Sequence, residues 1–274
     1  MPAKKTTVRI LALFTGLITL AAGPQAQANK VIAVGAYHFP PVAEVGENRQ
    51  ATGLLGDLVQ RLEAAHDDID FRIVHTSPKR RHLDFDARLY DVIFFESTDW
   101  GWTQRKVTAS RPILVDEDYY VALNKPERGP DFFQDLGNRR LIGIAGYHYG
   151  FANFETDTRA LQDNFRIEFS HSYGRNLELI KADRPSVAEV AIISRAYLQK
   201  HLSENPEDER RLLISDQPDQ QYQLRIIARE DGPISANELY QRMAPLMTDG
   251  SYQELVEKWG LRLPSDLTNF GELP

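Results

Sequence analysis

Short β-like runs alternate with longer amphipathic stretches along most of this chain, and this alternation is the feature that most constrains the fold. Residues 31–34 form an apolar run typical of a buried strand. Across residues 53–65, leucines recur on one face at helical spacing while charged residues lie off it. Because such a series normally builds sheets covered by helices, the pattern predicts an α/β protein. Further strands are expected at 71–74, 91–95, 119–123, 141–145, 187–193 and 224–228, and further helices at 78–89, 173–182, 195–202, 235–247 and 252–259.

A composition break divides this series into two units. The segment NKPERGP at residues 124–130 is rich in turn-forming residues, and a second strand and helix series follows it. The chain then returns to strand and helix near its C-terminus. We therefore expect two lobes joined by two chain crossings, with lobe one formed by residues 29–123 plus 227–274 and lobe two by residues 124–226.

The N-terminal 28 residues have the pattern of a cleaved export signal. Lys4, Lys5 and Arg9 precede an apolar stretch at residues 10–22, and Ala26-Gln27-Ala28 matches a small-x-small cleavage site. The apolar stretch is shorter than the ~20 residues that a membrane-spanning helix needs. We expect cleavage after Ala28 and a mature protein in the periplasm. The chain has no cysteine, which excludes a lipid anchor at the cleavage site.

Charge and motif content exclude several functional classes. Removing the leader would change the formal net charge from -7 to -10, which argues against nucleic acid as a partner. No cysteine is available for a thiolate zinc site, and no histidine pair stands at i, i+4 beside a helical glutamate. Neither a Gly-x-Ser-x-Gly elbow nor a phosphate loop is present. We expect a binding protein rather than an enzyme, with no cofactor and no metal.

Four segments carry a resemblance to a known family. They are KVIAVGAYHFPPV at residues 30–42, TGLLGDLVQRL at 52–62, WTQRKVTASRPI at 102–113 and MTDGSYQELVEKWGL at 247–261. In their order and spacing, the chain resembles the type 3 extracellular solute-binding proteins of ABC transporters, which include the polar amino-acid-binding proteins. The resemblance implies a two-lobe clamp of the type II periplasmic binding fold, which acts as a monomer. It also implies capture of a small anionic or amino-acid-like solute for an inner-membrane ABC permease.

The resemblance points to Arg105 as the anchor for a ligand carboxylate. A guanidinium group offers two parallel donors that match a carboxylate, and the pairing strengthens away from water. The alternative is a solvated arginine in a loop beside Lys106. Arg81, in the segment SPKRRHL, is a candidate second cation, whereas Lys79 and Arg80 are expected to form a solvated helix face.

Aromatic residues form the second group of candidates. Phe39, with Tyr37 beside it, is placed where relatives present an aromatic wall, although a core-packing turn is the equal alternative. Trp100 and Trp102 lie in a glycine-containing loop directly after an expected strand. Tyr147 belongs to GYHYG, whose free amides could hold an anion at a helix start, or which could form a plain tight turn.

One position departs from the family pattern. Amino-acid binders usually have an acidic residue at the end of the second-lobe strand, and this chain has Ser194 there. Glu96, at the end of the third expected strand, is a candidate substitute. The departure argues against a standard α-amino acid ligand. Two other functions stay open: a soluble ligand-sensing input for a membrane receptor, and a cyclic-acid dehydratase. For the dehydratase, no spacing selects a general acid among Glu96, Glu155 and His148.

Overall fold

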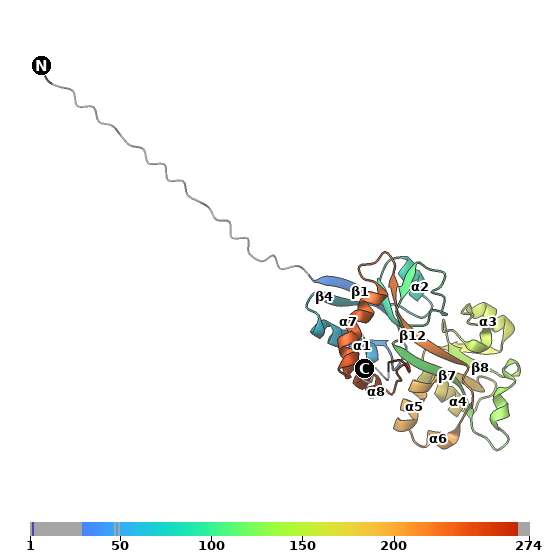
Figure 1. Cartoon of the computed structure of the whole chain (residues 1–274). Coiled ribbons are helices and arrows are strands. Elements are labelled where there is room, and N and C mark those ends of the chain that lie inside the picture. Colours follow the sequence, from blue (N-terminus) through green and yellow to red (C-terminus); the bar gives the residue numbers. More distant parts are fainter. Residues whose placement is uncertain (1, 3–28, 47, 49, 268–274) are drawn as a thin grey trace.

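The computed structural model describes residue 2, residues 29–46, residue 48 and residues 50–267 (Figure 1). The expected export signal therefore lies, apart from residue 2, outside the described residues. Within the described part of the chain, no helix is both long and apolar enough to span a bilayer.

The first lobe is built around a parallel group of strands. β1 (Lys30–Ala36) lies between β4 (Ile69–His75) and β5 (Val92–Glu96) and runs parallel to both. Helix α1 (Gly53–Ala65) packs on β4, and α7 (Ala236–Thr248) and α8 (Ser251–Lys258) complete this lobe. The leucine face expected in α1 is fully buried, which confirms that helix from its periodicity.

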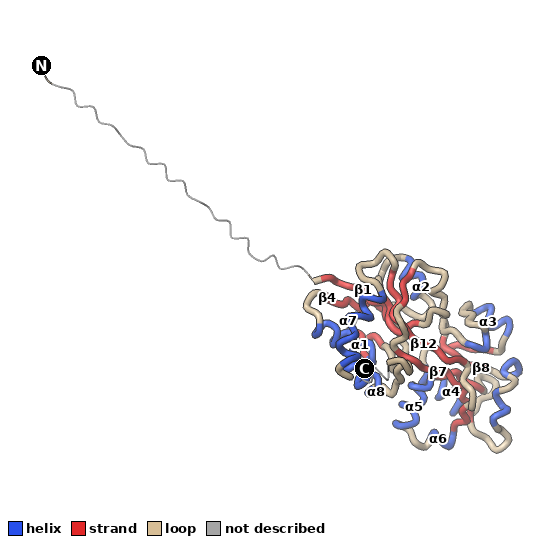
Figure 2. The backbone as a smooth tube through the Cα atoms, viewed as in Figure 1, coloured by secondary structure: helices blue, strands red, loops and turns tan. Residues whose placement is uncertain are grey.

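The second lobe repeats this arrangement. β8 (Leu141–Ile144) runs parallel to both β9 (Ile167–Ser170) and β10 (Val190–Ser194). Helices α4 (Tyr173–Lys181) and α5 (Arg195–Glu204) pack against β10 and β7 (Leu114–Leu123). Figure 2 shows the helices flanking the strands in both lobes.

Two long antiparallel strands join the lobes. β12 (Gln220–Arg229) pairs through its C-terminal half with β5 and β6 (Val107–Ala109), and through its N-terminal half with β7. β7 in turn pairs with β10 and with β11 (Leu212–Ile214). The strands therefore follow one path in the order β4-β1-β5-β12-β7-β10-β8-β9, and the chain crosses between lobes along β7 and β12.

The remaining elements are short. They are β2 (Glu44–Val45), β3 (Ala51–Thr52), α2 (Arg81–Asp86), α3 (Thr158–Asn164), α6 (Asp208–Arg211) and the 3-10 turns η1 (Pro130–Phe133), η2 (Leu136–Asn138) and η3 (Gly150–Ala152).

Several expected elements differ in length from those observed; the strand expected over residues 224–228, for example, is the longer β12. Two further differences are informative. The helix expected over residues 78–89 is limited to α2, and Arg88 beyond it has a left-handed φ of 60° that a helix cannot contain. The strand expected over residues 119–123 is observed as the longer β7. Its first half escaped the sequence pattern because two of its buried positions are Asp116 and Asp118, which interrupt the apolar run. Both differences affect the region between the lobes.

Candidate functional site

A small cavity of about 10 Å³, which is room for about one water molecule, lies between the two lobes. Two of its lining residues, Asp118 and Tyr222, come from the connecting strands β7 and β12. The others come from both lobes, so closing the lobes on each other completes the cavity. The full lining is Tyr37, Phe39, Arg81, Trp100, Asp118, Tyr147, His148, Tyr173 and Tyr222.

Aromatic rings form most of the wall. Phe39 packs edge-to-face against Trp100 at 6.1 Å and against Tyr147 at 5.9 Å between ring centroids, and it stacks on Tyr37 at 6.1 Å. These contacts join rings of the first lobe to a ring of the second. Tyr147 also donates its hydroxyl hydrogen to the His38 carbonyl oxygen at 2.7 Å. The wall is therefore rigid, largely apolar and continuous across the two lobes.

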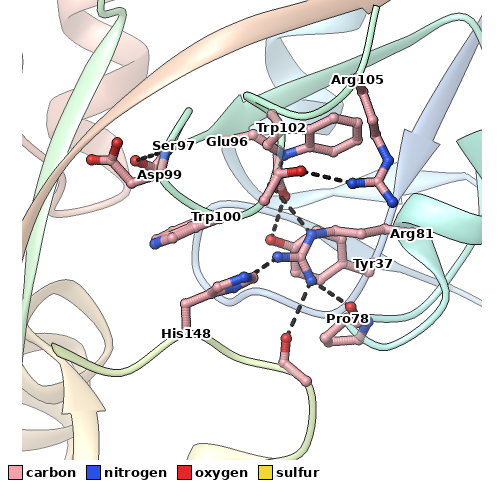
Figure 3. A network of polar contacts seen from close by, with 12 residues as sticks. Tyr37, Pro78, Arg81, Glu96, Ser97, Asp99, Trp100, Trp102, Arg105 and His148 are labelled. Carbon is pink, nitrogen blue, oxygen red and sulfur yellow. Dashed lines mark hydrogen bonds and ion pairs between the residues drawn. The ribbon is translucent and has the colours of Figure 1, made fainter. Parts of the chain in front are cut away.

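Arg81 is the central charged group beside this wall (Figure 3). Its side chain is 2 % exposed, and its Nε donates to Oε2 of Glu96 at 3.2 Å. Nη1 donates to the carbonyl oxygens of Pro78 and Gly146, and Nη2 donates to Nδ1 of His148 at 3.0 Å. Since Gly146 and His148 belong to the second lobe, Arg81 ties the lobes together.

Glu96 provides the counter-charge behind the cavity. Tyr37 donates to its Oε1 and the Trp102 indole donates to its Oε2, each at 2.6 Å. The carboxylate is fully buried and reaches this position through a bulge, since Phe94 and Phe95 of β5 stand opposite the single residue Ile226 of β12. Phe95 has a left-handed φ of 62°, a strained conformation that turns the end of the strand.

His148 is held as a neutral ring. Its Nδ1 accepts from Arg81, and its ring stacks on Trp100 with centroids 6.0 Å apart and planes 12° apart. Burial, together with the positive charge of Arg81, lowers the pKa of His148 to about 2. The imidazole therefore accepts from Arg81 at physiological pH and carries no charge into the cavity.

Asp118 is the acidic group of the cavity. Gln220 donates to its Oδ2 at 2.9 Å, and the Tyr222 hydroxyl donates to its Oδ1 at 3.3 Å. Burial, and then the nearby charges of Asp219 and Asp116, raise the pKa of Asp118 well above its usual range. A cation placed in the cavity would counter that shift.

The structure brings together five of the residues expected from the sequence. Tyr37, Phe39, Arg81, Trp100 and Tyr147 all line the cavity.

Two more expected residues form the layer behind the cavity wall. Trp102 donates a hydrogen bond to Glu96 there, and both side chains are buried.

The structure places Arg105 and Ser194 elsewhere. Arg105 pairs with Asp86 through two hydrogen bonds of 3.1 and 3.2 Å and donates to the Gly101 carbonyl oxygen, so its guanidinium group is already engaged outside the cavity. Ser194 caps α5 by accepting from the Tyr197 amide at 3.4 Å. Neither residue lines the cavity in this arrangement, so a ligand contact of Arg105 or Ser194 stays a prediction from the sequence.

Sequence reasoning missed Asp118, Tyr173 and Tyr222 and left His148 as a flanking residue. For Asp118 the sequence held a signal, because Leu114, Asp116 and Asp118 follow one another at every second position and so share the buried face of β7. An acidic residue on the buried face of a strand is rare unless it is paired or functional. Asp118 is also the direct cross-strand partner of Ser194, so the acidic group lies one strand away from the expected position.

Comparisons with known proteins support the fold. No family model and no curated protein matches the sequence. Among solved structures, a mutant of ArgBP from T. maritima matches with a TM-score of 0.64 at 19 % identity over 84 % of this chain and 94 % of that one. A binding component of an ABC transporter from Wolinella succinogenes, complexed with lysine, matches with a TM-score of 0.66 at 18 % identity over 84 % and 95 %.

A third match concerns the enzyme alternative. An ancestral amino acid-binding protein described as a precursor of cyclohexadienyl dehydratase has a TM-score of 0.61 at 15 % identity, covering 84 % of this chain and 94 % of that one. The expected two-lobe clamp, the type II periplasmic binding fold, is thus confirmed, and the resemblance stated from the sequence holds at the level of the fold.

Proposed function

We propose that this chain, which has the two-lobe fold of amino-acid-binding proteins of ABC transporters, captures a small polar solute between its lobes and releases it to a membrane permease. The observation that carries the proposal is the cavity, whose lining comes from both lobes and from the strands that join them. A solute enclosed there would be out of reach of solvent until the lobes separate.

The contacts between the lobes support opening and closing. Rings of the two lobes meet at Phe39–Tyr147 and Trp100–His148. Three hydrogen bonds also join the lobes: Arg81 to Gly146, Arg81 to His148 and Tyr147 to His38. Each joins groups that water can solvate equally well when the lobes part. Their net free energy is therefore small, and a bound solute can shift the balance towards the closed form.

We propose that residues 1–28 direct export and are removed, so that the mature protein works in the periplasm. The domain boundaries expected from the sequence, after residues 123 and 226, also remain a proposal. The pairing of β7 with β12 would place both chain crossings within these two strands.

The test is a titration of the mature protein, residues 29–274, with amino acids, amines, dicarboxylates and sugars. Binding is followed by calorimetry and by tryptophan fluorescence, since Trp100 lines the cavity. We expect one class to bind, and Trp100→Ala to weaken that binding. Arg105→Ala is the matched control, because Arg105 lies outside the cavity and should leave affinity unchanged. Failure of every class to bind would contradict the proposal.

A further inference from the structure

We infer that the solute carries a cationic amine and no carboxylate, and that its cationic group lies against Asp118 between the aromatic rings. The inference rests on the proposed function and names the substrate class of the same cavity. It differs from the anionic or amino-acid-like solute expected from the sequence.

Asp118 has fewer partners than the two acidic residues near it, Asp116 and Asp219. Asp116 is paired with Arg195, with 2.9 Å between Oδ1 and Nε. Asp219 accepts from the Gly150 and Phe151 amides and from the Tyr120 hydroxyl. In the described part of the chain, Asp118 has no ion pair within 4 Å and receives only the neutral donors of Gln220 and Tyr222.

Burying a carboxylate without a cation is costly, and a ligand can supply the missing charge. Asp118 is 4 % exposed and lines the cavity, so a ligand that enters between open lobes and widens this small space would contact it directly. The Asp118 carboxylate can accept about four hydrogen bonds and receives one each from Gln220 and Tyr222, so further lone pairs on its oxygens are free for a ligand.

The aromatic wall favours the same charge. Six of the nine lining residues are Tyr, Phe or Trp. The faces of such rings attract cations, by about 2 kcal/mol when the contact is shielded from water. A carboxylate would instead meet the negative ring faces and a second carboxyl group, that of Asp118.

Arg81 does not provide a carboxylate site, although it is the one lysine or arginine among the lining residues. Four of its five N–H groups are used by Glu96, Pro78, Gly146 and His148. Glu96 also balances its charge at 3.2 Å. In this closed arrangement Arg81 therefore does not offer the two parallel donors by which arginine recognises a carboxylate.

Matched pairs of compounds test the inference on the unmodified protein. Each pair compares an amine with the amino acid that has the same side chain and an added carboxylate: agmatine with arginine, cadaverine with lysine, histamine with histidine and ethanolamine with serine. Succinate represents an acid without an amine. Calorimetry gives the affinity of each, and we expect the amine of the best pair to bind at least about tenfold more tightly than its amino acid.

A variant then identifies the group responsible. Asp118→Asn keeps the shape and the contact to Tyr222 but removes the charge, and should weaken binding of the best amine by about 100-fold or more. A melting curve shows that the variant is folded, and Arg105→Ala is the control with unchanged affinity.

Three outcomes overturn the inference: tighter binding of the amino acids, binding of succinate, or unchanged amine affinity in Asp118→Asn. In each of these cases the protein still binds a solute, so the proposed function stands. Absence of binding by every compound here and in the wider panel would overturn both.

Discussion

Two ion pairs of the same chemistry have very different surroundings in this molecule. The side chains of Arg81 and Glu96 are 2 % and 0 % exposed, whereas those of Arg105 and Asp86 are 23 % and 51 % exposed. Removing one partner of a buried pair leaves an uncompensated charge that water cannot reach. Glu96→Gln should therefore lower the free energy of unfolding by about 3–5 kcal/mol, as measured by urea denaturation.

Asp86→Asn is the matched control for this change and should cost less than about 1 kcal/mol, because its pair is largely exposed. Similar losses in the two variants would contradict the view that Glu96 balances Arg81 behind the cavity.

His148 makes stability depend on pH. Its pKa is lowered to about 2 in the folded protein, so the unfolded chain binds a proton below pH 6.5 that the folded chain does not. Stability is lost as pH falls, by about 2 kcal/mol between roughly pH 7.5 and 5 for this residue. His148→Asn retains an acceptor for Arg81 and does not titrate, so this part of the loss should disappear from its urea denaturation series.

Other groups near His148 also titrate. Arg81 and His82 face the imidazole, and burial lowers the pKa of His82 to about 3, which gives a loss of the same sign. The raised pKa values of Asp116 and Asp118 act in the opposite direction, because they lower the stability of the protein as pH rises. These contributions are common to the wild type and His148→Asn, so the difference between their pH dependences of stability isolates the contribution of His148. An unchanged pH dependence in His148→Asn would contradict the assignment.

At the scale of elements, the turn between β8 and η3 controls how closely the lobes approach. Gly146 has a φ of +84°, and a Cβ there would lie 2.7 Å from the Lys79 amide nitrogen and Cγ in the opposite lobe. Gly146→Ala should hinder closure and weaken solute binding by about tenfold or more, because the closed form becomes less populated. Calorimetry with any solute that binds the wild type measures this.

Gly250→Ala provides the control for Gly146→Ala. Gly250 has a similar φ of +80°, but nothing lies within 4 Å of its added Cβ. This variant carries the same backbone strain without the contact between lobes. It should lose stability but keep its affinity, and equal affinity losses in the two variants would show that strain alone is responsible.

The elements differed in how well the sequence predicted them. α1 was predicted with its correct bounds, because four leucines on one face are a strong local signal. The N-terminal half of β7 was missed because its buried positions include two aspartates, whose partners Arg195 and Gln220 lie about 80 and 100 residues away in the sequence. Arg81 and Arg105 could not be told apart from sequence, since only the folded chain places Glu96 beside one and Asp86 beside the other.

For the whole molecule, the architecture predicts one dominant motion. β7 and β12 are the strands that cross between the lobes, while the contacts closing the cavity join the start of α2 and the loop at His38 to the loop that holds Gly146 and Tyr147. A bend in two strands moves each lobe as a unit, because the parallel strands and helices within a lobe remain packed. Distances across the cavity should change on solute binding, and distances within a lobe should not.

Spin labels can measure this motion on a clean background, because the chain has no cysteine of its own. Lys79 and Arg159 are exposed residues of the first and second lobe respectively, and Lys79 lines a surface hollow between the lobes together with Thr158, the neighbour of Arg159. With both changed to Cys and labelled, the distance measured by electron resonance should be longer and more broadly distributed without solute, and should shorten when a saturating solute selects the closed form. The pair Arg159→Cys and Arg184→Cys, both in the second lobe, should give one unchanged distance. A single distance across the cavity, independent of solute, would mean that the lobes form a rigid unit and would contradict capture by closure.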